Sequence, residues 1–231
     1  MQLLQPEYRS IPCTKNYFRK KITLQSQFYR LTLNIINMKI LKITILSLTV
    51  VLIAATSFAQ KIKVKEGDKN ILKNESTINI EFTFNDLSVG KYKKEEDYIA
   101  AKKEEFNKKE AGRGDNWAKK WKDDQEYRFP SDFVNLFTKN AKMTTDKNAK
   151  YTLIFHTTSI EPGFNIGITR KNAYIDGEVL IVETANKDKV LARLTIEDAR
   201  GKVFMGNDYD TGERISESYA KAGKELGQYL K

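Results

Sequence analysis

Residues 151–160 read YTLIFHTTSI, the first of three consecutive strand-like segments that decide the fold. The second reads AYIDGEVLIVET at residues 173–184, and the third reads VLARLTIED at residues 190–198. The first segment begins with apolar residues on both faces, which is typical of a central strand. The third alternates apolar and polar residues, as a strand with one face in the core does. Because the connections are short, the three segments predict an antiparallel meander.

The rest of the fold is predicted from hydrophobic periodicity. Residues 77–84 alternate in the same way, with Ile78, Ile80, Phe82 and Phe84 on one side, and predict a further strand. Helical spacing predicts helices at residues 92–110, 117–127, 132–142 and 211–230. Asp210 followed three residues later by Glu213 predicts a capping box for the last helix.

The order of these elements is one strand, a group of helices, three strands and a final helix. This order predicts an α+β fold, with a four-stranded, mainly antiparallel sheet and the helices packed on one of its faces.

Residues 38–59 have the three parts of a secretory signal peptide. Met38 is followed by Lys39 and Lys42, then by an apolar run, and then by small residues that end at Ala59. This order predicts cleavage after Ala59. The rival interpretation is an uncleaved membrane anchor, but a spanning helix needs about 20 apolar residues, and this run is shorter.

The rest of the chain is predicted to have three parts, one before the signal peptide and two after it. Residues 1–37 are interpreted as an over-extended gene start or as an unusual, disordered leader. Residues 60–76 are polar and rich in lysine, and we expect a linker there. Residues 77–231 are expected to form a single domain.

Charge and cysteine content favour a compartment outside the cytosol. The chain carries 40 basic and 30 acidic residues, but residues 1–59 hold eight of the basic and one of the acidic ones. The rest therefore has a net charge of about +3, which gives little support to a nucleic-acid partner. Cys13 is the only cysteine, so no disulfide and no lipidated cysteine at the cleavage site are expected. We expect a periplasmic or secreted protein that contacts the membrane only through its signal segment.

The connection at residues 161–171 contains the strongest candidate for a binding site. Phe164, Ile166 and Ile168 alternate with small and polar residues, and Arg170 follows them. One interpretation is that the hairpin extends and packs its apolar side on the helices. The other is an exposed apolar tip that engages a partner.

Candidates for catalysis or metal binding are few. His156 is the only histidine and has neither a second histidine nor a nearby cysteine to share a metal, so we expect a structural or surface role. Asp208, Asp210 and Glu213 bring carboxylates together and are a candidate calcium site, although their spacing is not that of an EF-hand. We expect no cofactor and no enzymatic activity; the alternative is a hydrolase that uses Asp208 and Asp210 as a carboxylate pair.

Two further patterns have both a functional and a structural interpretation. Residues 91–122 mix lysines with Trp117 and Trp121, which could bind an anionic polymer or could form solvated helices docked by the two tryptophans. Arg113-Gly114-Asp115 is the integrin-binding tripeptide, but glycine and aspartate are also expected between two helices.

Residues 130–230 resemble a known group of proteins. The matching stretches are YTLIF from residue 151, GEVLIVET from 177, KVLAR from 189 and RISESYAKAGKELG from 214. They resemble uncharacterised exported bacterial envelope proteins with a fold like the periplasmic domain of the curli-secretion lipoprotein. Such relatives are commonly lipid-anchored through a cysteine, whereas this chain has no cysteine at its predicted cleavage site. The resemblance implies an assembly or binding role in the cell envelope and transfers no catalytic residue. We therefore expect a non-enzymatic envelope protein that binds a protein or a cell-surface polymer.

Overall fold

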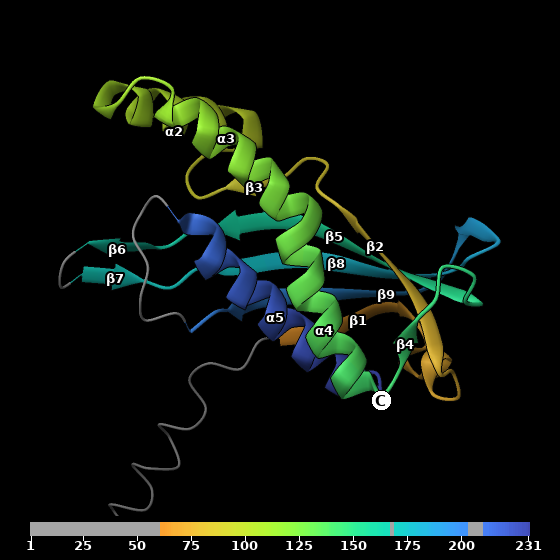
Figure 1. The fold of residues 1–231 in the computed structure, drawn as a ribbon. Coiled ribbons are helices and arrows are strands. Elements are labelled where there is room, and N and C mark those ends of the chain that lie inside the picture. The colour runs from red at the N-terminus through yellow and green to blue at the C-terminus, as the bar shows by residue number, and fades with distance from the viewer. Residues whose placement is uncertain (1–60, 167–168, 203–209) are drawn as a thin grey trace, which may run out of the picture. The chain divides into compact units, whose positions relative to one another are not determined.

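The computed structural model describes residues 61–166, 169–202 and 210–231, and it has an α+β fold (Figure 1). The long strands are β2 (Thr77–Thr83), β5 (Tyr151–Glu161), β8 (Tyr174–Glu183) and β9 (Asn186–Arg200). The helices are α2 (Glu95–Lys109), α3 (Arg113–Asp123), α4 (Phe129–Ala141) and α5 (Thr211–Tyr229), with a π-helical turn at Asp124–Arg128 between α3 and α4. Shorter elements are β1 (Lys61–Gly67), a 3-10 turn (Lys69–Leu72), β3 (Ser88–Val89), β4 (Thr144–Thr145), β6 (Phe164–Ile166) and β7 (Thr169–Lys171).

The sheet is mixed and larger than the sequence predicted. Within the described residues it has seven strands, in the order β1-β9-β8-β5-β2-β4 with β3 also beside β5. The pairs β5–β8 and β8–β9 are antiparallel, which confirms the predicted meander. The prediction of four mainly antiparallel strands is wrong, because β2 and β3 run parallel to β5. The chain between β2 and β5 contains α2, α3 and α4, and a helical crossover of this kind connects parallel strands.

The edge strand β1 lies within residues 60–76, where the sequence predicted a linker. It pairs antiparallel with β9, and the Lys63 ammonium lies 3.0 Å from the Glu197 carboxylate. Ile62 packs on the core, while Lys63 and Lys65 are exposed. Lysines on an edge strand discourage pairing with another chain, so the lysine-rich composition that suggested a linker suits an edge strand equally well.

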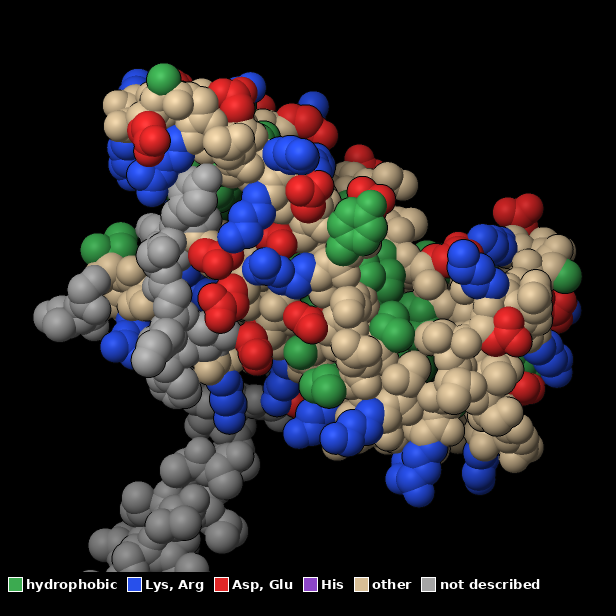
Figure 2. Space-filling model, viewed as in Figure 1, with side chains coloured by type: hydrophobic (Ala, Val, Ile, Leu, Met, Phe, Trp, Pro, Cys, Tyr) green, Lys and Arg blue, Asp and Glu red, His purple; other side chains and the backbone are tan. Residues whose placement is uncertain are grey.

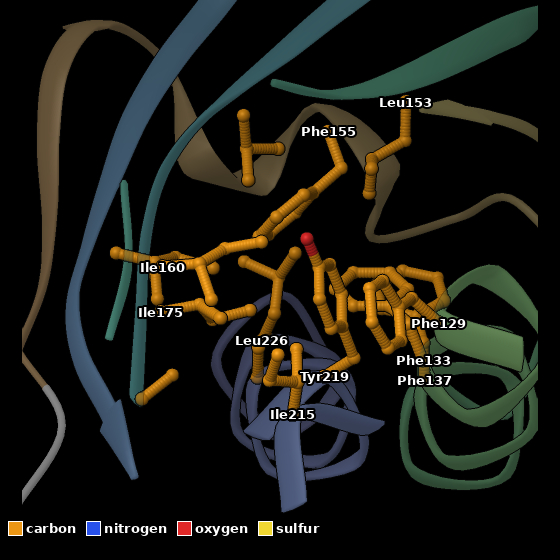
Figure 3. Close-up of a cluster of buried hydrophobic side chains, with 14 of the residues drawn as sticks. Phe129, Phe133, Phe137, Leu153, Phe155, Ile160, Ile175, Ile215, Tyr219 and Leu226 are labelled. Atoms are coloured by element: carbon orange, nitrogen blue, oxygen red, sulfur yellow. The ribbon is translucent and has the colours of Figure 1, made fainter. Parts of the chain in front are cut away.

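Helices α4 and α5 lie side by side across one face of the sheet (Figure 1). Figure 3 shows Phe129, Phe133 and Phe137 of α4 meeting Tyr219 of α5 and Phe155 of β5. The rings of Phe129 and Tyr219 are stacked with centroids 4.9 Å apart, and those of Phe133 and Phe155 are also 4.9 Å apart. This aromatic layer is the centre of the core.

Tyr219 is fully buried, yet its hydroxyl has a partner. The oxygen lies 2.7 Å from the hydroxyl oxygen of Thr157 on β5. Burial raises the pKa of the Tyr219 phenol far above its usual range, because ionisation in the core would leave a charge without water. The hydrogen bond ties α5 to the middle of the sheet.

Two glycines let the backbones of α4 and α5 come into contact. A Cβ atom at Gly223 would lie 2.2 Å from the carbonyl oxygen of Phe133, and one at Gly227 would lie 2.6 Å from that of Phe137. The spacing of four places both glycines on the same face of α5. A residue with any side chain at Gly223 would push the helices apart. None of the described helices is long and apolar enough to cross a membrane.

Gly223→Ala is expected to lower the free energy of unfolding by about 1–3 kcal/mol, because the added methyl group overlaps the Phe133 carbonyl. Urea unfolding followed by circular dichroism measures the change. Lys224→Ala, at an exposed neighbouring position, is the control and should change stability by less than about 0.5 kcal/mol. Unchanged stability of the Gly223→Ala variant contradicts the close helix contact.

Candidate functional site

The predicted hairpin at residues 161–171 is a separate two-stranded unit. β6 and β7 pair antiparallel, with Asn165 opposite Arg170, and together they project beyond the end of the main sheet (Figure 1). The chain enters the hairpin through Gly163, whose φ is +63° and whose Cβ would lie 2.2 Å from the Lys171 carbonyl oxygen. Only glycine suits this position. The Lys171 ammonium lies 2.8 Å from the Glu161 carboxylate and closes the base of the hairpin.

The structure places most of the predicted binding residues on this hairpin. Ile166 has 64% of its surface exposed and is one of the three exposed large hydrophobic residues of the described chain, with Val64 and Tyr127. Arg170 is exposed, and Phe164 is half-buried. Ile168 lies outside the described residues. The exposure of Ile166 favours the interpretation as an apolar tip over that of a hairpin packed on the helices.

A hollow of about 320 Å³ lies at the root of the hairpin. We call it the hairpin hollow; its walls include Lys91, Tyr92, Tyr98, Lys102, Phe164 and Arg214. The rings of Tyr92 and Tyr98 meet edge to face with centroids 5.8 Å apart. Sequence reasoning missed this hollow because its walls come from four segments distant in sequence: the turn before α2, α2 itself, the start of β6 and the first turn of α5.

Arg214 is the buried cation of the hairpin hollow. Only 4% of its surface is exposed, and its Nε donates to the carbonyl oxygen of Pro162 at 3.3 Å. No sequence signal indicated this residue, because an arginine is rarely buried.

A second, larger hollow of about 980 Å³ lies between the loop after β2 and the start of α2. Its lysines Lys93, Lys94 and Lys122 are matched by Asp86, Glu95 and Glu96, which also line it. Positive and negative groups are therefore balanced there, and the hollow has no net attraction for a charged ligand.

Glu95 is a buried carboxylate with three hydrogen-bond donors. Only 6% of the residue is exposed. It accepts from the Trp121 indole at 2.5 Å, the Gln125 amide at 2.7 Å and the Lys122 ammonium at 2.7 Å. These bonds join the start of α2 to α3 and to the π-helical turn. Because its acceptor positions are used within the fold, Glu95 is a structural rather than a reactive group.

The contacts of helices α2 and α3 agree with the structural interpretation of residues 91–122, in which the two tryptophans dock solvated helices on the core. Trp117 and Trp121 are buried and stacked, with centroids 5.6 Å apart, so neither ring is available to stack on a sugar or a base. Several helix lysines are engaged in ion pairs at 2.6–2.9 Å: Lys102 with Glu105, Lys103 with Asp115, Lys108 with Glu104 and Lys109 with Glu105.

The Arg-Gly-Asp tripeptide has a structural role between α2 and α3. A Cβ atom at Gly114 would lie 2.0 Å from the Lys103 carbonyl oxygen, so only glycine lets the two helices approach this closely. The Asp115 carboxylate pairs with Lys103 at 2.7 Å and accepts from Asn107 at 3.1 Å. The pKa of Asp115 is lowered mainly by its bond from Lys103.

The candidate calcium ligands are only partly within the described residues. Asp210 is engaged by cations, with Lys120 at 2.9 Å and Arg128 at 3.5 Å. Burial alone would raise the pKa of Asp210, but the hydrogen bond from Lys120 and the two positive charges bring it below its usual value. Asp208 lies outside the described residues, which contain no cluster of three potential metal ligands. The calcium site and the Asp208–Asp210 pair therefore stay predictions.

The capping box predicted for α5 is wrong. The Asp210 side chain turns to Lys120 and makes no capping hydrogen bond. The buried carboxylate of Asp124 lies against the first turn of α5, since one of its oxygens would lie 1.8 Å from a Cβ at Gly212. This carboxylate also pairs with Arg128 at 3.1 Å, and an anion at the start of a helix is favourable. Burial raises the pKa of Asp124, although the positive charges of Arg128 and Lys120 oppose the shift.

His156 contacts the neighbouring strand β2. It is half-buried on β5, and its Nδ1 lies 2.9 Å from the Thr83 hydroxyl on β2. Its neighbour Phe155 is in the core. Because successive residues of a strand point to opposite faces, His156 points to the other face of the sheet. No metal-binding cluster forms around it in the described part of the chain.

Glu95→Gln is expected to destabilise the protein by about 1–3 kcal/mol. The amide nitrogen of glutamine cannot accept a hydrogen bond, so at least one of the three donors around it loses its partner. Thermal unfolding measures the effect. Glu96→Gln, the exposed neighbour, is the matched control and should be nearly neutral; equal effects of the two changes contradict the structural role of Glu95.

Comparison with known proteins adds no family. No protein-family model matches the chain, and no curated protein sequence does. Among solved structures, the PelC dodecamer from Paraburkholderia phytofirmans is similar at 10% sequence identity and a TM-score of 0.36, over 74% of this chain and 97% of that one. A point variant of the same dodecamer gives the same TM-score, identity and share of this chain, over 98% of its own length. A TM-score this low establishes neither a shared fold nor a shared function.

Proposed function

We propose that the chain is an exported, non-enzymatic protein of the bacterial cell envelope that binds a protein or a cell-surface polymer through the tip of the β6–β7 hairpin. The observation that carries this proposal is the position of Ile166. It is a large apolar side chain, 64% exposed, on a hairpin that projects past the sheet. Because it lies in solvent on a projecting element, this apolar group is accessible to a partner.

The charged surface of the sheet supports this choice of site. On the strands, charged side chains are paired with each other: Lys187 with Glu81 at 2.7 Å, Lys63 with Glu197 at 3.0 Å and Arg193 with Glu178 at 3.1 Å. Figure 2 shows acidic and basic side chains interspersed over the visible face of the molecule. A surface neutralised in this way offers little to a charged partner, whereas Ile166 on β6 offers an exposed apolar group.

The ion pairs within α2 and α3 favour this proposal over binding of an anionic polymer along those helices. Most of the lysines that suggested such binding already have carboxylate partners. The partner-binding role of the hairpin needs no such charges.

Export is tested by N-terminal sequencing of the protein recovered from fractionated cells. The expected first residue is Gln60, in the periplasmic fraction or the medium, because the small residues before it fit the signal-peptide cleavage site. Recovery of the intact chain from the cytoplasmic fraction contradicts export.

The tip is tested by Ile166→Ser. The intact exported protein is cross-linked in envelope preparations through a photoreactive residue placed at position 165, and the partner is identified by mass spectrometry. We expect Ile166→Ser to reduce recovery of that partner by at least about tenfold, as loss of a central apolar contact does. The stability of the fold should not change, because Ile166 lies in solvent.

Val64→Ser is the matched control for this experiment. Val64 is the exposed apolar residue of the edge strand β1, so the change removes a similar group at a distant place. Equal recovery of the partner by the wild-type protein and the Ile166→Ser variant excludes the tip as the binding site.

A further inference from the structure

We propose that the outer edge of β2 binds an extended segment of a partner protein, which adds to the sheet as a further strand. This site goes beyond the proposed function, because it does not use the hairpin and binds through backbone hydrogen bonds instead of an apolar side chain. The occupant is a polypeptide, since an extended polypeptide repeats N–H and C=O groups at the spacing that a strand edge requires.

Strand β4 covers only the first part of the outer edge of β2 (Figure 1). It pairs with Thr77 and Ile78, and the Asp146 N–H then donates to the Ile78 carbonyl oxygen at 3.0 Å. The chain turns after Asp146 and enters β5, which pairs with the inner edge of β2 over residues 79–83. In the described part of the chain, the outer edge of β2 therefore has no neighbouring strand along residues 79–83.

Ile80 and Phe82 are the residues whose backbone groups point out of this edge. Along a strand, the N–H and C=O groups of successive residues point to alternate sides. The Ile78 carbonyl points to the β4 side, so the groups of Ile80 and Phe82 do the same, whereas those of Glu81 point to β5. Among the described residues, no loop backbone or side chain hydrogen-bonds to these outward groups. Each of the two residues thus offers a donor and an acceptor to an added strand.

The sequence of β2 lacks the features that keep an edge strand from pairing. Edge strands are commonly protected by lysine, proline or a bulge. β1, at the opposite edge, reads KIKVKEG, with lysines at alternate positions and a register shift between Val64 and Glu66. β2 reads TINIEFT, and Lys187 neutralises its one charged residue, Glu81, at 2.7 Å. The edge of β2 is therefore suited to pairing, whereas that of β1 is protected.

The larger hollow, of about 980 Å³, lies at the end of this edge. Phe82 and Thr83 of β2 line it, together with Phe84 and Leu87 from the loop that follows. Phe84 is half-buried and Leu87 is buried, so the hollow has an apolar wall beside the open end of the strand. Its volume is enough for several side chains. The edge supplies the hydrogen bonds, and the hollow accepts side chains of the added segment.

The shape of the edge favours a separate extended segment over a second copy of this chain. Two copies that paired antiparallel through β2 would place residues 77–78 of one copy opposite residues 84–85 of the other. The outer side of residues 77–78 is already occupied by β4. Each β4 would therefore lie in the path of the other copy, whereas a single extended segment ends before it reaches β4.

Amide hydrogen exchange of the isotopically labelled protein, followed by NMR, tests whether the edge is open. After correction for intrinsic rates, we expect the amides of Ile80 and Phe82 to exchange at least about tenfold faster than that of Glu81, which bonds to β5. Glu81 lies between them and is a control within the same strand. Equal protection of the three amides overturns the inference, because the edge is then closed.

An octapeptide of alternating threonine and valine, with a short polyethylene glycol tail for solubility, is the binding probe. At a peptide concentration ten times its dissociation constant, exchange of the Ile80 and Phe82 amides should slow about tenfold, while the amides of β1 are unaffected. Ile166→Ser, which tests the hairpin tip, should not change this protection. Absence of binding, equal slowing on β1, or loss of the effect in Ile166→Ser overturns the inference.

Two N-methylated forms of the probe are a matched pair, one methylated on every threonine amide and the other on every valine amide. Because successive amides point to alternate sides, only one set can face β2. We expect one form to bind at least about tenfold more weakly than the other, since it has lost its hydrogen-bond donors. Equal affinities contradict binding through the backbone. Protection of Ile80 and Phe82 that rises with protein concentration alone, with a dimer in sedimentation velocity, identifies a second copy as the occupant and also overturns the inference.

Discussion

The contact between the backbones of α4 and α5 is the constraint on which the rest of the structure depends. Gly223 and Gly227 bring α5 against the carbonyl oxygens of Phe133 and Phe137, and this close approach lets Tyr219 stack on Phe129 and reach Thr157 on the sheet. The same contact fixes the position of α5 against the rest of the fold. Its first turn, with Thr211 and Arg214, then forms one wall of the hairpin hollow. Helix packing in the core thus sets the geometry of a surface site.

The π-helical turn links the start of α2 to the start of α5. Its wider turn buries two consecutive polar residues, Asp124 and Gln125. Gln125 donates to Glu95 at the start of α2, and the Asp124 carboxylate lies against Gly212 at the start of α5. In a regular α-helix successive side chains are about 100° apart, and a π-helical turn often marks a place where such spacing is adjusted for a specific contact.

The sequence predicted the α+β class, the main helices and the four long strands because each carries its own hydrophobic period. It did not show β1, whose lysines resemble those of a linker and whose strand form depends on pairing with β9. It did not show that β2 is parallel to β5, because the relative direction of these two strands depends on the path of the long helical connection between them. The tip residue Ile166 could be predicted from alternation within the hairpin. The hollow could not, because Lys91, Tyr98, Phe164 and Arg214 meet only after folding.

The burial of both tryptophans has a practical consequence for spectroscopy. Trp117 and Trp121 are the only two indoles of the chain, and they are stacked in one cluster between α2 and α3. Their emission therefore reports on how these helices are held together. Tyr98 contacts both indole rings, with centroids 5.7 Å and 5.1 Å away, and also lines the hairpin hollow. The fold thus places an intrinsic optical reporter one side chain away from its candidate binding site.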